Sequence, residues 1–262
     1  MEPLVDSHCH LDFPEIRPRL ETVLARMEEA LVRHALVVGV KQSTWARLLE
    51  VAEGDPRLYA ALGVHPNEEG FDGEEQLFSA LMAALDHLKA VAVGETGLDY
   101  YRNRVPEEIQ QKRLRVHIAA ARQKRLPLVI HCRQAAQDTL RILEEEKAAE
   151  VGGVLHCFTE SLEVARHAIA LNFHISFSGI LTFKNADDLR RTASFLPLDR
   201  LLVETDSPYL APEPYRRQVN EPALVRQVAK ALADARQEAE DLVAAATTRN
   251  FFSLFSRARP CA

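Results

Sequence analysis

Two histidines separated by one residue end a short apolar run near the start of the chain, "LVDSHCHLDF". In a β-strand, residues i and i+2 point to the same face, so His8 and His10 would project side by side while Cys9 points to the opposite face. Paired imidazoles on one face suit a metal ion, although two unrelated histidines would give the same pattern. The rest of the chain has to decide between these interpretations.

Other apolar runs also end in imidazole or carboxylate side chains. They supply His65 after "YAALGV", Glu95 in "AVAVGE", His131 in "PLVIHC", His156 in "GVLHCF", and Glu204 and Asp206 in "RLLVETD". Taken singly, each is more often a hydrogen-bonded core residue, a helix cap or an ion-pair partner. Because these residue types are uncommon inside apolar strands, their recurrence at run after run predicts a metal site.

The apolar runs recur at intervals of about 20 to 35 residues, which leaves room for one helix between each pair. They lie at residues 3–8, 35–40, 59–66, 90–95, 127–132, 153–158, 173–179 and 200–206. Eight βα units in 262 residues match a (β/α)8, or TIM, barrel, so we expect residues 1–262 to form a single α/β domain. The metal site would then lie at the carboxyl ends of the strands, and "RNFFSLF" would end a closing helix.

Six side chains are the predicted ligands, and they are His8, His10, Glu95, His131, His156 and Asp206. Six are too many for one tetrahedral zinc and suit two ions that share a ligand. Glu95 is the natural bridge because a carboxylate has two oxygens. We therefore assign His8, His10, Glu95 and Asp206 to one ion, and Glu95, His131 and His156 to the other.

Two cations would acidify a water held between them toward hydroxide, which makes that water the predicted nucleophile. The two carboxylate ligands favour magnesium or manganese in function, with zinc as the alternative. Asp206 is the candidate acceptor of the water's proton, and Glu204 is expected to orient a ligand or water. No serine or cysteine nucleophile is required.

The composition limits the other function classes. The formal net charge of −6 removes the bulk attraction of long-duplex binders, so any nucleic acid would be held by local cations. No apolar run approaches the roughly 20 residues of a membrane helix, and no obligate protein partner is evident. Four cysteines without framework spacing, and no leader-like start, predict a cytoplasmic protein. Cys9, Cys132 and Cys157 are expected to face the helical layer, and Cys261 to lie in an exposed tail.

Seven stretches, in order from residue 6 to residue 222 with a short "NEP" at the end, resemble a known family. They are "DSHCHLDF", "GVHPNE", "GETGLDYYR", "VIHCR", "LHCFTES", "ISFSGILTFKNA" and "VETDSPYLAP". The chain is similar to the TatD-type metal-dependent deoxyribonucleases, which belong to the amidohydrolase-like barrels. The resemblance implies a divalent-metal phosphodiesterase that removes nucleotides from DNA ends, typically 3′ to 5′ and from single strands. The family's ligand motif coincides with the six residues assigned above.

The loop "PYRRQVNEP" departs from the family pattern, because Arg217 and Gln218 stand where glycine and lysine are usual. This difference concerns substrate contact and leaves the metal ligands untouched. Arg102, Arg133, Lys184 and Arg216 follow strand ends and are candidates for a cationic rim that binds the nucleic-acid backbone. Each is otherwise an ordinary solvated loop charge.

Three aromatic residues and one histidine are further candidates for substrate contact. Tyr100, Tyr101 or Phe183 would stack on a base, unless they are half-buried packing residues. His65 is either a hydrogen-bond donor to phosphate or a structural turn histidine before Pro66.

Two alternative functions stay open at this stage. The same dinuclear hydroxide would attack a carbonyl carbon, so the substrate is alternatively an amide or an ester such as aminoacyl-tRNA. A non-enzymatic metal-binding or scaffold protein is the third possibility. The unbroken ligand set speaks against it, because decayed enzymes usually lose a ligand.

Overall fold

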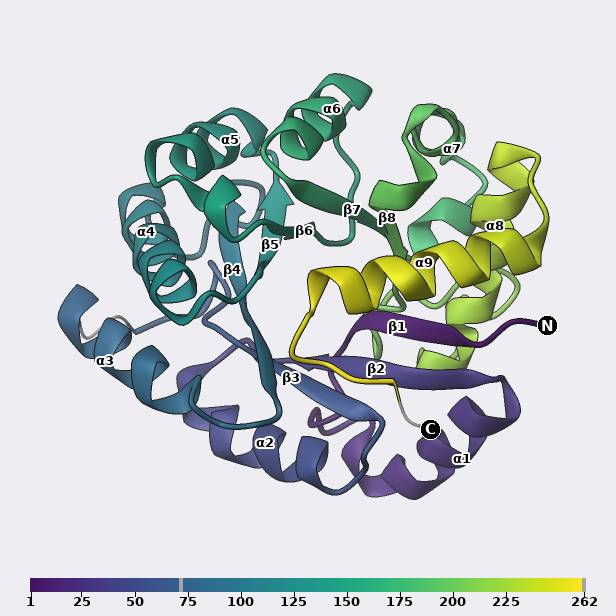
Figure 1. Cartoon of the computed structure of the whole chain (residues 1–262), viewed down its shortest axis with the longest axis horizontal. Helices are drawn as coiled ribbons and strands as arrows, with labels where there is room; N and C mark the ends of the chain where they lie inside the picture. The colour runs from purple at the N-terminus through teal and green to yellow at the C-terminus, as the bar shows by residue number, and fades with distance from the viewer. Residues whose placement is uncertain (71–72, 261–262) are drawn as a thin grey trace.

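Eight parallel strands form one sheet in which each strand pairs with the next along the chain. The computed structural model describes residues 1–70 and 73–260. Its strands are β1 (Leu4–Cys9), β2 (Val32–Val38), β3 (Leu58–Leu62), β4 (Ala90–Asp99), β5 (Leu128–Arg133), β6 (Gly153–Leu155), β7 (Phe173–Phe177) and β8 (Leu201–Val203). The sheet curls into a nearly closed barrel, which confirms the predicted TIM-barrel fold (Figure 1).

Helices follow the strands and form a ring around them (Figure 1). They are α1 (Leu20–Glu29), α2 (Trp45–Glu53), α3 (Glu74–Ala84), α4 (Glu107–Lys124), α5 (Ala136–Glu145), α6 (Leu162–Ala170), α7 (Asp187–Phe195), α8 (Val225–Arg236) and α9 (Glu240–Leu254). Short 3₁₀ turns lie at Arg17–Arg19, Gln42–Thr44, Ala148–Glu150, Gly179–Thr182, Leu198–Arg200 and Pro222–Leu224. In the part of the chain that the structure describes, no helix has the length and apolar character needed to cross a membrane.

Two apolar cores hold the barrel together. The larger core fills the space between the strands and the surrounding helices. The smaller one lies inside the barrel and includes Leu36, Ala61 and Val129 of the strands. These side chains pack with Phe251 of α9 and with Phe255, the residue that follows the helix. Because α9 packs against β1 and β8, it closes the end of the barrel at which the strands begin, as the sequence predicts (Figure 1).

At the opposite end of the barrel, the segment after β8 forms backbone hydrogen bonds with the end of β1. The backbone N–H of Asp206 donates to His8 O at 2.9 Å, and the N–H of His10 donates to Ser207 O at 2.8 Å. These bonds bring Asp206 beside the two histidines of β1. The carboxyl ends of the strands therefore converge on one site.

Several strand ends differ from the sequence-based prediction, and those of β4, β6 and β8 concern the candidate metal site. The run predicted at residues 90–95 continues as β4 to Asp99, whereas β6 and β8 end at Leu155 and Val203. His156, Glu204 and Asp206 therefore lie in the turns that follow, not in the strands. Cys157 and Asp206 have φ of +45° and +56°, a left-handed backbone that interrupts the extended chain.

Candidate metal centre

Glu95 lies at the centre of the site, and its two carboxylate oxygens face different groups of imidazoles. It is buried near the middle of β4, with 3 % of its surface exposed. Oε2 faces His8 and His10, and Oε1 faces His131 and His156. This arrangement is the one expected of a carboxylate that bridges two ions.

The first group brings together the residues predicted for one ion. The Nε2 atoms of His8 and His10 lie 3.3 Å apart, and Glu95 Oε2 lies 3.4 Å from that of His8. Asp206 Oδ1 lies 3.7 Å from His8 Nε2 and 3.4 Å from His10 Nε2. Four potential ligand atoms from β1, β4 and the turn after β8 thus surround one point.

The second group consists of the residues predicted for the other ion. Glu95 Oε1 lies 3.0 Å from His131 Nδ1 and 3.0 Å from His156 Nε2, and these two nitrogens lie 3.4 Å apart. These distances bring the six predicted residues together, with Glu95 between the histidines. Their division into two ligand sets and the ions themselves stay predictions.

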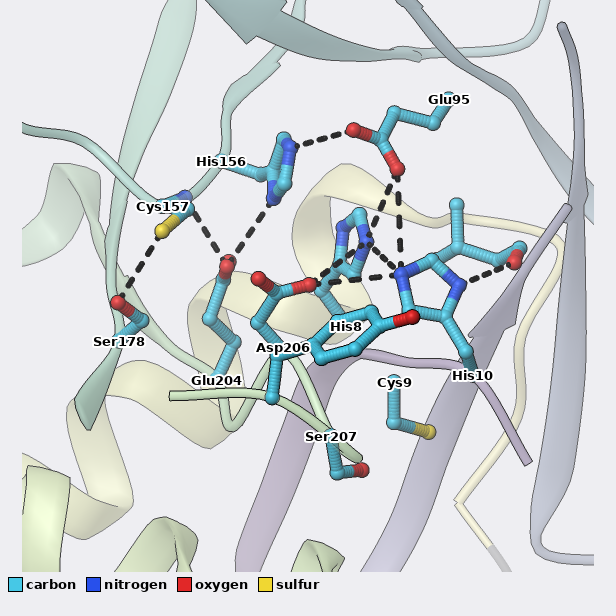
Figure 2. A network of polar contacts seen from close by, with 12 residues as sticks. His8, Cys9, His10, Glu95, His156, Cys157, Ser178, Glu204, Asp206 and Ser207 are labelled. Atoms are coloured by element: carbon cyan, nitrogen blue, oxygen red, sulfur yellow. Dashed lines mark hydrogen bonds and ion pairs between the residues drawn. The ribbon is translucent and has the colours of Figure 1, made fainter. Parts of the chain in front are cut away.

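Acceptors on the outer side of three histidines fix how their rings are oriented. His10 Nδ1 lies 2.8 Å from Val38 O, and His156 Nδ1 lies 3.1 Å from Glu204 Oε1 (Figure 2). His131 Nε2 lies 3.3 Å from Asp99 Oδ2. In each ring the nitrogen beside the acceptor carries the proton, so the other nitrogen directs its lone pair to the centre. This is how proteins prepare histidine as a metal ligand.

The outer nitrogen of His65 accepts a hydrogen bond, unlike those of the three histidines above. Its Nδ1 accepts a hydrogen bond from the backbone N–H of Asn67 at 3.0 Å, so in the neutral ring Nε2 carries the proton. Burial lowers the pKa of His65 to about 3, which keeps the ring neutral. Nε2 lies 3.5 Å from Glu95 Oε1, at the edge of the second group. His65 therefore presents a hydrogen-bond donor to the centre, which favours the predicted phosphate donor over a turn residue.

The imidazoles keep Glu95 ionised in spite of its burial. Burial alone would raise the pKa of its carboxyl group, but the neighbouring His156 and His131 outweigh this and hold the pKa well below its usual range. A charged carboxylate is the form that a bound cation requires. The electrostatics of the site therefore suit positive charge at its centre.

The donor set fits divalent metal ions. Three groups of described residues place their ligand atoms within 4.8 Å of one another, namely His8, His10 and Glu95; His8, His156 and Glu204; and His65, Glu95 and His131. His8 Nδ1 and Glu204 Oε2 are buried without a hydrogen-bond partner, which is costly unless another group satisfies them. Imidazole and carboxylate ligands together suit zinc or manganese as well as magnesium.

A pocket of about 510 Å³ opens directly above these ligands. This volume lies in the range of about 300–1,000 Å³ that holds small-molecule ligands. Glu95, His131, His156 and Asp206 line its floor, and Arg102, Arg104 and Arg133 are among its other lining residues. Cationic side chains therefore adjoin the candidate metal ligands in a chain whose net charge is −6.

The chain matches a known protein family over most of its length. Residues 5–256 match the family described as TatD related DNase. The chain belongs to the TatD family. It is a metal-dependent hydrolase on an amidohydrolase-like barrel, with histidine and glutamate clusters able to bind metal.

Relatives match the chain over nearly its whole length. It is 40 % identical over 252 residues to YabD of Bacillus subtilis, which covers 96 % of this chain and 98 % of that protein. It is 42 % identical over 257 residues to YcfH of Escherichia coli K12, covering 96 % and 95 %. Both are described as uncharacterized metal-dependent hydrolases. The crystal structure of the TatD homologue YjjV from Escherichia coli has a TM-score of 0.90 at 32 % identity and covers 97 % of this chain and 98 % of that one.

The predicted rim residues of this TatD-family chain divide into two sets. Arg102 and Arg133 line the pocket. Arg216 is not among the pocket-lining residues, since its guanidinium lies 3.7 Å from the centre of the Phe183 ring and donates to Ala211 O at 3.1 Å. Lys184 is an exposed loop residue that does not line the pocket either.

All three aromatic candidates contact other groups of the protein. The Tyr100 hydroxyl donates to Asp138 Oδ2 at 2.8 Å, which makes this ring part of the packing between β4 and α5. Tyr101 is exposed, and the Arg133 guanidinium lies 4.0 Å from its ring centre. Phe183 is covered by Arg216 in the same way.

Sequence reasoning missed several residues that support the ligands. Asp99 accepts from His131 and from Asn67 Nδ2 at 2.7 Å, and its position four residues after Glu95 was the only signal. Asp6 binds the turn after β8, where its Oδ2 accepts from Thr205 Oγ1 at 2.5 Å. Arg104 lines the pocket without having been identified.

The prediction for the cysteines is confirmed for Cys9 and in part for Cys132. Cys9 is fully buried in the outer core, whereas Cys132 is half-buried, lies beside Thr139 of α5 and also lines the pocket. The prediction is wrong for Cys157, which lies in the turn beyond β6 and lines the pocket, with Sγ 3.2 Å from Ser178 Oγ. Strand alternation does not apply there because the strand has already ended. Cys261 lies outside the described residues.

Proposed function

We propose that the chain is a divalent-metal-dependent phosphodiesterase that removes nucleotides from the ends of DNA, from single strands and in the 3′ to 5′ direction. The observation that carries this proposal is the position of Glu95, whose two carboxylate oxygens face separate groups of imidazoles. Such a pair of sites, each of which includes at least one carboxylate oxygen, suits ions that bind phosphate.

Two divalent ions bound by these residues would neutralise the phosphodiester and activate a water for in-line attack. The protein supplies the rest of the chemistry. His65 donates from Nε2 to a phosphate oxygen, and Asp206 accepts the proton of the attacking water. Glu204 holds the His156 ring through Nδ1, so it acts by orienting a ligand.

The charge distribution supports nucleic acid as the substrate class. Arg102, Arg104 and Arg133 adjoin the ligands and match a phosphate backbone. The pocket has a volume of about 510 Å³, and its candidate ligands are buried, with His156 5 % and Glu95 3 % exposed. These features support cleavage at a flexible end rather than within a rigid duplex.

The test is cleavage of a labelled single strand by purified full-length protein. The protein is incubated with magnesium, manganese or zinc and with 5′- or 3′-labelled single-stranded DNA, with aminoacyl-tRNA and a cyclic amide as parallel substrates. We expect metal-dependent shortening from the 3′ end, abolished by chelation and lowered at least 100-fold in Glu95→Ala and Asp206→Ala.

The two variants control for a contaminating nuclease, because the activity of a contaminant would be the same in the variant and wild-type preparations. Turnover of only the carbonyl substrates would refute the phosphodiesterase. Cleavage from the 5′ end would refute the direction but keep the reaction class.

A further inference from the structure

Two aromatic side chains that no ligand assignment explains form one wall of the metal pocket. Phe13 lies in the turn after β1, and Tyr209 lies three residues after Asp206; both line the pocket. Their ring centres are 6.2 Å apart with an interplanar angle of 73°, an edge-to-face pair. Tyr209 is 52 % exposed although its body is a large aromatic ring.

The chain holds the Tyr209 backbone firmly while leaving the ring in solvent. The N–H of Tyr209 donates to Asp206 O at 3.0 Å, and its carbonyl accepts from Asn220 Nδ2 at 2.6 Å. Asn220 is fully buried. With its backbone fixed, only the side-chain torsions of Tyr209 need to be ordered when a ligand binds, which limits the entropy lost on binding.

This aromatic pair adjoins the candidate metal ligands. The Phe13 ring stacks on His10 with a centroid separation of 4.6 Å and an interplanar angle of 17°. His10 Nε2 in turn lies 3.4 Å from Asp206 Oδ1. A flat group placed against Phe13 and Tyr209 would therefore lie next to a phosphate bound at the centre.

The exposed ring of Tyr101 and the half-buried ring of Phe183 are already stacked. Arg133 covers one face of Tyr101, and Arg216 covers one face of Phe183. Arginine also lies at the pocket mouth, where it matches phosphate rather than a base. The pocket thus combines an aromatic wall with cationic side chains, which is the combination that binds single-stranded nucleic acid.

We infer that the Tyr209 ring, which Phe13 meets edge-to-face at 73°, forms a stacking platform for one nucleobase of the substrate, next to the phosphate that the metal ligands bind. This inference rests on the proposed function and makes it more specific. The platform reads the flat face of a base and makes no base-specific hydrogen bond, so it accepts all four bases. It selects nucleotides over sugar phosphates that lack a base.

A binding experiment tests the platform without requiring turnover. Calorimetry in the presence of manganese compares deoxyadenosine 5′-monophosphate with deoxyribose 5-phosphate on the full-length protein. The wild type is expected to bind the nucleotide about 5- to 150-fold more tightly. Tyr209→Ala should remove most of this preference and leave the affinity for deoxyribose 5-phosphate unchanged, whereas Tyr209→Phe should keep the preference.

A cleavage experiment applies the same logic to DNA. Single strands with an abasic site at the terminal or the penultimate nucleotide are compared with intact strands. We expect Tyr209→Ala to lower kcat/KM on intact strands by the factor lost in binding, with no further loss on the strand that lacks the stacked base. Phe195→Ala is the matched control, because Phe195 at the end of α7 is 57 % exposed and lies outside the metal pocket.

Manganese affinity of each variant separates stacking from damage to the metal site. The inference is overturned if the wild type binds both phosphates equally, or if Tyr209→Ala weakens both to the same extent. Phe13→Leu provides a second test, since it removes the other ring and keeps an apolar side chain beside His10. If the wild type fails to cleave DNA with any metal yet prefers the nucleotide, the nuclease assignment fails and the platform stands.

Discussion

The Glu204 carboxylate lies 3.1 Å from Nδ1 of His156, on the side of the ring that faces away from Glu95. The same oxygen of Glu204 accepts the backbone N–H of Cys157 at 3.0 Å, so the turn after β6 and the turn after β8 are joined at this point (Figure 2). Glu204 is fully buried. It therefore determines both the tautomer and the direction of the His156 ring.

Replacing Glu204 should weaken metal binding without removing a predicted ligand of the two groups. In Glu204→Ala the His156 ring loses the acceptor that fixes it, and we expect metal affinity to fall by about 10- to 100-fold. Glu204→Gln keeps an acceptor oxygen and should lose less. Competition with a chelating dye measures both affinities. Equal affinities in Glu204→Ala and the wild type would contradict this role.

Gly97 lies where β4 packs closely on β5. It has a φ of +142°, and a Cβ placed there would lie 1.9 Å from His131 O. Gly97→Ala must therefore shift the backbone that carries His131, at a cost on the order of 2–4 kcal/mol in the free energy of unfolding. Gly54→Ala is the control, because its Cβ would lie 3.5 Å from Val51 O, an ordinary contact. Urea unfolding of both variants checks the difference.

The six predicted ligands could be identified from the sequence because each interrupts or ends an apolar run. A barrel of parallel strands brings all carboxyl ends to one face, so residues far apart in the chain meet without any further information. The position of a residue at a strand end predicts where in the fold its side chain lies but not how that side chain is oriented. His65 illustrates the limit, since only the bond from Asn67 to its Nδ1 shows that it presents a donor.

The supporting residues depend on backbone paths that sequence patterns do not reveal. The predicted strand ends at Glu95, yet the chain stays extended to Asp99, where Gly97 packs directly on His131. The position of Arg216 likewise depends on how the loop after β8 folds. Its contact with Phe183 joins loops about thirty residues apart, which no local pattern encodes.

His117 should make stability depend on pH. Its ring is fully buried in α4, where Nδ1–H donates to Arg113 O at 2.7 Å and Nε2 accepts from Val64 N–H at 3.1 Å. Burial lowers its pKa to about 4. Well above pH 6.5 neither the folded nor the unfolded state binds a proton at this site, so His117 has no effect on the pH dependence there.

Below pH 6.5 the unfolded chain takes up a proton that the folded protein does not, so the free energy of unfolding falls as the pH falls toward about 4. The contribution of one such histidine is at most about 1.4 kcal/mol per pH unit. His117→Gln should flatten the slope by that amount between pH 6 and 4.5, measured by urea unfolding. His34 and His174, which are also lowered to about 4, should maintain the remaining slope. An unchanged slope in the variant would contradict the assignment.

Asn220 should control the position of Asp206 from outside the ligand set. Its side-chain Nδ2 donates to Thr205 O at 2.8 Å and to Tyr209 O at 2.6 Å, so it ties together the two sides of the turn in which Asp206 has a left-handed backbone. Asn220→Ala leaves two carbonyl groups without this donor, and we expect the free energy of unfolding to fall by about 2–3 kcal/mol. Because the turn then relaxes, manganese affinity should fall as well. Asn185→Ala, at an exposed asparagine, should change neither quantity, and normal manganese affinity in Asn220→Ala would show that Asp206 holds its place without this bond.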